Sequence, residues 1–163
     1  MEGNCYVKLD GIDGESTDKQ HEKWIQMWSW QWGVSNTGRA GSGVVGQTRG
    51  VSMVQDFSFT KQLDKASAKI QEKCLNGTNI PKVTISVCGI GEKELHEYLR
   101  YDLNDCVITS YSIGGTSEMP QENLTVNFSK VEWTYTPLGR DGKPDSGAKQ
   151  SGFKWDVTKN TAA

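Results

Sequence analysis

The sequence predicts a mainly β protein of about eight strands and one helix, which would form a barrel or a sandwich. Most apolar residues alternate with polar ones in short segments, as they do in strands that bury one face. One segment instead repeats its apolar residues with helical spacing, and glycine-rich or polar stretches separate the segments. Because 163 residues is the ordinary size of one domain, we expect residues 1–163 to form a single domain around one core.

The first two strands are predicted in the N-terminal third of the chain. Cys5, Val7 and Leu9 alternate with polar residues, and an Asp- and Gly-rich turn follows them. The next strand places three tryptophans and a valine on one face, which we expect to be core: Trp28, Trp30, Trp32 and Val34. Ser29 and Gln31 lie on its other face, toward water or a polar cavity. Because Ile25 and Met27 have the opposite parity, we expect a bulge or burial on both faces where this strand begins.

A long loop is predicted over residues 35–50, where the chain becomes polar and rich in glycine. A loop of this length in a compact domain usually has a function, and one that cannot pack on its own core is a candidate for packing on a neighbouring molecule. The residues that define this candidate are Gly38, Arg39, Gly41, Gly43, Val44, Val45, Gly46 and Gly50.

The remaining elements follow from the same two periods. A strand with Val51, Met53, Phe57 and Phe59 on one face precedes the predicted helix, which spans about Asp64 to Leu75 and ends before Gly77. Further strands are predicted around 83–87, 99–103, 106–113, 124–128, 131–135 and 153–157. We expect a hairpin at Asn104-Asp105 and a bulge near Ser129 or Lys130, where the alternation changes parity.

Charge and composition exclude several kinds of partner. The net charge is −2, with both signs mixed along the chain, which argues against a nucleic-acid or anionic-membrane surface as the main partner. The first residues have neither the basic nor the apolar stretch of a signal peptide, and no run approaches membrane-spanning length. We therefore expect the protein to be made and kept in the cytoplasm unless a signal-independent exporter moves it. The four cysteines are widely spaced, and we interpret them as reduced core thiols.

The sequence contains no recognisable catalytic, metal or cofactor motif. The glycines between Gly41 and Gly46 match a dinucleotide-binding fingerprint, but a strand follows them where that motif requires a helix. His21 and His96 are the only histidines, and neither stands at ligand spacing, so we expect both at the surface or its boundary. We therefore expect no enzyme activity and no cofactor, although a small enzyme of unrecognised type stays an alternative.

A carbohydrate-binding sandwich is a second alternative, because exposed aromatic side chains stack on sugar faces. The tryptophans of residues 28–32 share a strand face with Val34, which fits a core better. A monomeric module of this kind would show saturable quenching of tryptophan fluorescence by oligosaccharides.

Six segments taken in order resemble the haemolysin-coregulated protein (Hcp) family of bacterial type VI secretion. They are Tyr6-Val-Lys-Leu-Asp-Gly-Ile-Asp-Gly-Glu-Ser16, Trp28-Ser-Trp-Gln-Trp-Gly33, Phe57-Ser-Phe-Thr-Lys61, Leu63-Asp-Lys-Ala-Ser67, Cys74 with Gly77 and Ile80-Pro81, and Gly152-Phe-Lys-Trp-Asp156. Each segment alone is a weak signal, but together they run along nearly the whole chain.

The resemblance implies a β-barrel of two packed sheets with a flanking helix, in subunits that form homohexameric rings. Such rings stack into the inner tube of a contractile injection machine, meet its sheath and tip spike proteins, and carry small effector proteins in their lumen. The tube is assembled in the bacterial cytoplasm and is then secreted without a signal peptide. By this resemblance the loop from Gly38 to Gly50 would contact the adjacent ring, and Ser29 and Gln31 would face the lumen as candidates for cargo contact, with ordinary solvent exposure as the alternative.

Overall fold

Residues 4–38 and 50–163 are described by the computed structural model, and within them the chain forms twelve strands and one helix. In chain order these elements are β1 (Cys5–Leu9), β2 (Ile25–Met27), β3 (Ser29–Gln31), β4 (Val34–Asn36), β5 (Ser52–Val54), β6 (Phe57–Gln62), α1 (Ser67–Asn76), β7 (Ile80–Ile90), β8 (Leu95–Gly114), β9 (Gln121–Asn127), β10 (Lys130–Tyr135), β11 (Ser151–Asp156) and β12 (Thr161–Ala162). The predicted mainly β class with one helix is confirmed.

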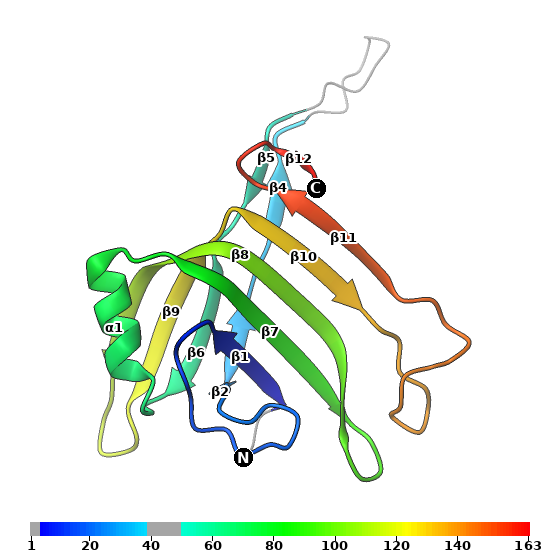
Figure 1. Cartoon of the computed structure of the whole chain (residues 1–163), viewed down its shortest axis with the longest axis horizontal. Coiled ribbons are helices and arrows are strands. Elements are labelled where there is room, and N and C mark those ends of the chain that lie inside the picture. The colour runs from blue at the N-terminus through cyan, green and yellow to red at the C-terminus, as the bar shows by residue number, and fades with distance from the viewer. Residues whose placement is uncertain (1–3, 39–49) are drawn as a thin grey trace.

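The strands form two sheets that share the long strand β8 (Figure 1). We name them sheet A, in the order β12-β11-β10-β8-β7-β1-β2, and sheet B, in the order β3-β6-β9-β8. Every pairing is antiparallel, and β4 pairs with β5 in a separate two-stranded ribbon. The described strands do not close into a barrel, so the barrel expected from the resemblance is an arrangement of two packed sheets.

Strand β8 replaces the hairpin that the sequence predicts at Asn104-Asp105. Its first half pairs with β7 and β10 as far as Cys106, and from Val107 it pairs with β9. Asp105, at the crossing point, has a φ of 51°, a conformation that Asp tolerates better than most residues do. The chain therefore bends and passes from one sheet to the other without reversing, and the predicted hairpin is wrong.

The second predicted strand is broken at Trp28. Ile25 and Met27 are fully buried in β2, whereas β3 turns Trp30 inward, so the predicted change of parity is confirmed. Trp28 itself is 55% exposed and Val34 is 61% exposed, which corrects their assignment to the core. The break lets one short segment serve sheet A before it and sheet B after it.

A similar change of sheet occurs at residues 128–129, where the sequence predicts a bulge. β9 belongs to sheet B and β10 to sheet A, and Ser129 between them donates a backbone hydrogen bond of 3.0 Å to the Asn104 carbonyl. The parity change is therefore real, but it separates two strands and does not mark an extra residue inside one.

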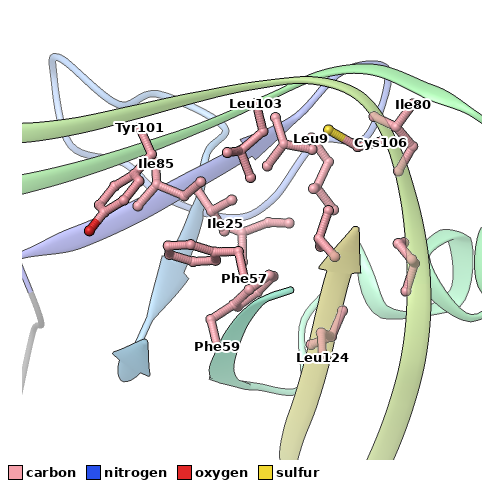
Figure 2. Close-up of a cluster of buried hydrophobic side chains, with 14 of the residues drawn as sticks. Leu9, Ile25, Phe57, Phe59, Ile80, Ile85, Tyr101, Leu103, Cys106 and Leu124 are labelled. Atoms are coloured by element: carbon pink, nitrogen blue, oxygen red, sulfur yellow. The ribbon is translucent and has the colours of Figure 1, made fainter. Parts of the chain in front are cut away.

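The core fills the space between the two sheets (Figure 2). Tyr101, Leu103 and Ile85 contribute from sheet A, while Phe57, Phe59 and Leu124 contribute from sheet B. Each such side chain contributes about 1.5–3 kcal/mol when it is fully removed from water, so this cluster is the main stabilising feature of the fold.

Helix α1 lies beside β8 and β9 at one side of the sheets (Figure 1). It starts three residues later than predicted, because Asp64 to Ala66 form a turn in which the Asp64 carboxylate accepts the Ala66 N–H at 2.9 Å. Ile70 is buried against the core, and Gly77 ends the helix with a φ of 61°, as the predicted cap requires.

A buried ion pair attaches this helix to sheet B. The Lys61 ammonium on β6 contacts the Glu122 carboxylate on β9, and it also donates to Asp64 Oδ1 at 2.9 Å. Ser67, the first residue of α1, donates its hydroxyl to Glu122 at 2.9 Å, and Tyr111 donates to the other carboxylate oxygen. Burial and the Glu122 charge raise the pKa of Tyr111, so its hydroxyl keeps the proton that it donates.

Two further expectations can be compared with the described residues. Cys5, Cys74, Cys88 and Cys106 are all free, as predicted, and Cys88 and Cys106 are buried. Among the described residues, no helix has the length and apolar character that crossing a membrane demands.

Candidate assembly and cargo surfaces

The residues predicted to face a polar space, Ser29 and Gln31, are both exposed on the outer face of β3. They line a hollow of 410 Å³ that crosses all four strands of sheet B. Its polar lining consists of Ser29, Gln31, Ser58, Thr60, Ser110, Ser112, Asn123 and Thr125. We name this surface the hydroxyl face, because all but two of these side chains carry hydroxyl groups and none of the described lining residues is charged.

Many of these hydroxyls bond to one another. The Oγ atom of Ser29 lies 2.6 Å from Oγ1 of Thr60, and Thr125 Oγ1 lies within 2.7 Å of the hydroxyls of Thr109 and Ser110. At one end of the face, Asp56 accepts hydrogen bonds from Thr109 and Asn127 at 2.7 and 2.8 Å. Their mutual hydrogen bonds fix the hydroxyls in place, while their remaining hydrogen-bonding capacity points outward.

A second hollow lies between the β4–β5 ribbon and β11. It has a volume of 380 Å³, and we name it the apolar groove. Its apolar lining comprises Trp32, Val34, Met53, Val54, Val131, Phe153 and Trp155. Within it the rings of Trp32 and Phe153 stack with centroids 6.4 Å apart, while Val34 and Met53 project from the ribbon and are mostly exposed.

The apolar groove was not predicted from the sequence. Phe153 and Trp155 fit an ordinary half-buried strand, and Met53 shares a parity with the buried Phe57. A partial signal was present, since three apolar side chains stand on the two short strands that flank the glycine-rich loop, namely Val34, Met53 and Val54. An exposed concentration of apolar side chains such as this one commonly marks an interaction site.

The predicted stacking loop lies mostly outside the described residues. Arg39, Gly41, Gly43, Val44, Val45 and Gly46 all belong to residues 39–49, whereas Gly38 and Gly50 are described. These two glycines meet at the end of the ribbon, where a Cβ on Gly50 would come within 2.0 Å of the Gly38 nitrogen. The backbones are so close there that only glycine fits at position 50. The ribbon also includes Ser35 and Asn36 in β4, so part of the predicted loop is strand.

The structure brings together one cluster that resembles a catalytic triad, which the sequence did not predict. His21 Nδ1 lies 2.6 Å from Asp18, and His21 Nε2 lies 2.9 Å from the Ser86 hydroxyl, which is the order of groups in a serine hydrolase triad. Ser86 is completely buried, however, and its hydroxyl donates to Glu97. The oxygen is therefore not presented to a substrate. His21 is only 3% exposed, so the expectation that it lies at the surface is wrong, whereas His96 is half-buried, as expected.

Comparison with known proteins gives a consistent result. Residues 6–135 match the family model described as type VI secretion system effector, Hcp. The chain is 33% identical to protein hcp1 of Pseudomonas aeruginosa over the full length of both chains. A solved type six secretion system protein superposes with a TM-score of 0.88 at 29% identity, covering 98% of each chain, and Hcp1 from Salmonella typhimurium does so with a TM-score of 0.78 at 26% identity over the whole of both chains. The chain therefore belongs to the Hcp family of type VI secretion tube proteins.

Proposed function

We propose that this protein is the inner-tube subunit of a type VI secretion machine, that its copies form homohexameric rings, and that these rings stack into a tube. The observation that carries the proposal is the likeness to Hcp proteins along the entire chain, because a tube subunit needs its whole surface and not one local site. In this role residues 1–163 act as one structural unit without catalysis or a cofactor.

The apolar groove is the proposed contact between neighbouring subunits of one ring. Val34 and Met53 are mostly exposed there, beside an aromatic wall. Burying such side chains against a neighbour removes apolar area from water, and this removal favours association. A ring contact is heterologous and closes by rotation, so each subunit would present the groove to one neighbour and a different surface to the other.

Stacking between rings is assigned to the segment from Gly38 to Gly50, whose described ends are held together by the β4–β5 ribbon. Because stacking is open-ended, it can continue from ring to ring and build a tube. The tube must also come apart after use, so its individual ring-to-ring contacts should be weak and numerous.

The hydroxyl face is the proposed lumen surface, with Ser29 and Gln31 as candidates for contact with small effector proteins. Uncharged donors and acceptors can hydrogen-bond to many polar protein surfaces without selecting one sign of charge. Sheath and tip spike proteins are the other proposed partners, with no role for nucleic acid or membrane insertion. The tube would be assembled in the cytoplasm and then exported.

Negative-stain electron microscopy tests the ring directly. The purified protein should give class averages with six-fold symmetry and an open centre, and the variant V34D should give single subunits, because it places a charge in the apolar groove. V34T, which keeps the size of the side chain without the charge, is the matched control and should retain rings. Rings that persist in V34D would remove the apolar groove from the contact, and the absence of rings from the unmodified protein would refute the proposed function.

A further inference from the structure

A chain of polar groups, buried at its centre and partly exposed at both ends, connects the segment between β1 and β2 to the outer face of sheet A. It runs from Asp18 through His21 to Ser86 on β7, and on to Glu97 on β8. The two contacts of the imidazole ring are 2.6 Å long at Nδ1 and 2.9 Å long at Nε2. His21 and Ser86 are both buried, so water cannot readily replace a missing link.

The position of the ring is fixed by its surroundings. Tyr6 on β1 stacks on it with ring centroids 4.3 Å apart, and Trp24 meets it edge-on at 5.0 Å. The Asp18 carboxylate is itself held by backbone N–H groups of Gln20 and His21, each at 3.1 Å. Both ring nitrogens therefore face their oxygen partners with little freedom to turn away.

The three links of the chain require one proton more than its members ordinarily supply. The three links, from Asp18 to His21, from His21 to Ser86 and from Ser86 to Glu97, need one proton each. With both carboxylates ionised, a neutral imidazole supplies one proton and the Ser86 hydroxyl supplies another. Because the Ser86 hydroxyl donates its single proton to Glu97, the link between Nε2 and Ser86 is complete only if Nε2 carries a proton of its own.

We propose that this chain is a proton-dependent latch, in which His21 is an imidazolium that donates from both nitrogens to hold the β1–β2 segment on sheet A. The third proton is assigned to the ring because an imidazolium donates from both of its nitrogens, and each ring nitrogen here faces an oxygen. Arg100 on β8 lies 3.6 Å from Glu97, so a cation stands beside the last carboxylate of the chain.

Besides Tyr6, which stacks on the ring, Cys88 is a titratable group beside it, and this thiol does not supply the missing proton. Cys88 Sγ on β7 lies 3.8 Å from Nε2, farther than the Ser86 oxygen. Burial raises the pKa of the Cys88 thiol to about 11, so the sulfur keeps its own proton. The sulfur also lies 3.5 Å from the Ser86 oxygen, and both of its contacts are weak compared with the three links between Asp18, His21, Ser86 and Glu97.

The latch predicts the direction in which the stability of the fold changes with pH. When the extra proton leaves as the pH rises, one link loses its hydrogen atom, and two carboxylates then face a chain without a positive charge. At pH values where the native state holds this proton and the unfolded chain does not, the unfolding equilibrium constant should rise by up to tenfold per pH unit. The proposal concerns the folded subunit itself and does not depend on ring formation.

The variant E97Q provides an unusually direct control. A glutamine amide at position 97 can donate its own hydrogen atom to Ser86, and Ser86 can then donate to Nε2, so that all three links form with a neutral ring. E97Q should therefore keep the shape of the chain but remove its need for the extra proton. The imidazolium should be present in the unmodified protein and absent from E97Q.

Solid-state NMR of sedimented protein labelled with ¹⁵N-histidine reads this difference at any size of assembly. His96 is the only other histidine and is assigned with the variant H96Q. At pH 7.0 we expect two protonated ring nitrogens for His21 in the unmodified protein and one unprotonated nitrogen in E97Q. A neutral His21 ring in the unmodified protein, or an imidazolium that persists in E97Q, would overturn the proposal.

Discussion

Buried charges concentrate the specific interactions of this fold at a few residues. Lys61 and Glu122 are both fully enclosed, and between them they contact Asp64, Ser67 and Tyr111. Taking such charges out of water is costly, and only their mutual attraction and the surrounding hydrogen bonds offset that cost. The pair therefore stabilises the attachment of α1 only as long as every member is present.

Replacing Lys61 by methionine should lower the free energy of unfolding by about 3–5 kcal/mol, because the variant K61M leaves the Glu122 carboxylate buried without its partner. Urea denaturation followed by tryptophan fluorescence measures the change. K65M is the matched control, since Lys65 is exposed on the neighbouring turn. Equal effects of K61M and K65M would show that the buried pair does not hold the helix.

Asp102 gives the fold a predictable response to acid. Burial opposes ionisation of this carboxyl, but hydrogen bonds from Arg100 at 2.9 and 3.3 Å and the charge of Lys82 outweigh burial and hold its pKa below the usual value. A lowered pKa means that the ionised group stabilises the fold above about pH 4, and that this contribution disappears as the pH falls through the folded-state pKa.

The variant D102N should therefore lose less stability than the unmodified protein between about pH 4 and pH 2. Urea midpoints recorded across this range measure the slope. D10N serves as a control because Asp10 is exposed and forms no ion pair with any of the described residues. If D102N and D10N keep the same acid slope as the unmodified protein, Arg100 and Lys82 do not set the pKa of Asp102.

At the scale of the elements, the period of the sequence predicts what each segment is, but not where it goes. Cys5, Val7 and Leu9, and likewise Val83, Ile85 and Val87, lie in strands as their alternation predicts, and Gly77 ends the helix. The place of each segment in the fold depends on whether the chain reverses between strands. Asp105 has the composition of a hairpin turn but lies within a continuous strand, because β8 has partners on both sides of that point.

The exposure of Trp28 and Val34 follows from the same limitation. Alternation shows that residues share a face, but a break at Trp28 changes which face is inward, and nothing local distinguishes a core from an interface. Part of the hydroxyl face could be predicted from the sequence, since Ser29 and Gln31 stand on the strand face opposite the tryptophans. The apolar groove as a whole could not be predicted, because it lies between the ribbon and β11, which follows the ribbon by about a hundred residues in the sequence.

The C-terminal cap of α1 offers a test at this scale. In the variant G77A, a Cβ would meet no neighbouring atom within 4 Å, but alanine would have to adopt a φ of 61°. We expect a loss of about 1 kcal/mol in the free energy of unfolding, due to backbone conformation alone. Thermal denaturation should be compared between G77A and G114A, since Gly114 is an exposed strand-end position with equally open surroundings. The comparison separates the cost of the backbone conformation at the cap from the general effect of replacing glycine by alanine. An equal loss in both variants would rule out the cap as the cause.

The glycine-rich segment offers a second test. Val44 and Val45 lie outside the described residues, and their proposed role is contact with the adjacent ring. V44D or V45D should impair the stacking of rings while leaving single rings intact, because a charge opposes the burial of an apolar side chain. Electron microscopy of these variants beside V45T distinguishes single rings from tubes, and intact tubes would remove this segment from the account.

For the whole molecule, the two hollows lie on different surfaces and suit different roles. The hydroxyl face is polar and uncharged, as the proposed cargo-facing wall requires, while the apolar groove is lined by the β4–β5 ribbon and β11. A monomer would have no need to expose Val34, Met53 and Phe153 side by side. The fold therefore makes most sense as one subunit of a larger assembly.

The central claim is that this chain assembles with copies of itself into a hexamer. Size-exclusion chromatography with light scattering on the purified, reduced protein measures its mass in solution without assumptions about shape. The hexamer should have a mass near six times 18.1 kDa. A species of 18.1 kDa that persists at high protein concentration would contradict it and would direct attention to the carbohydrate-binding alternative.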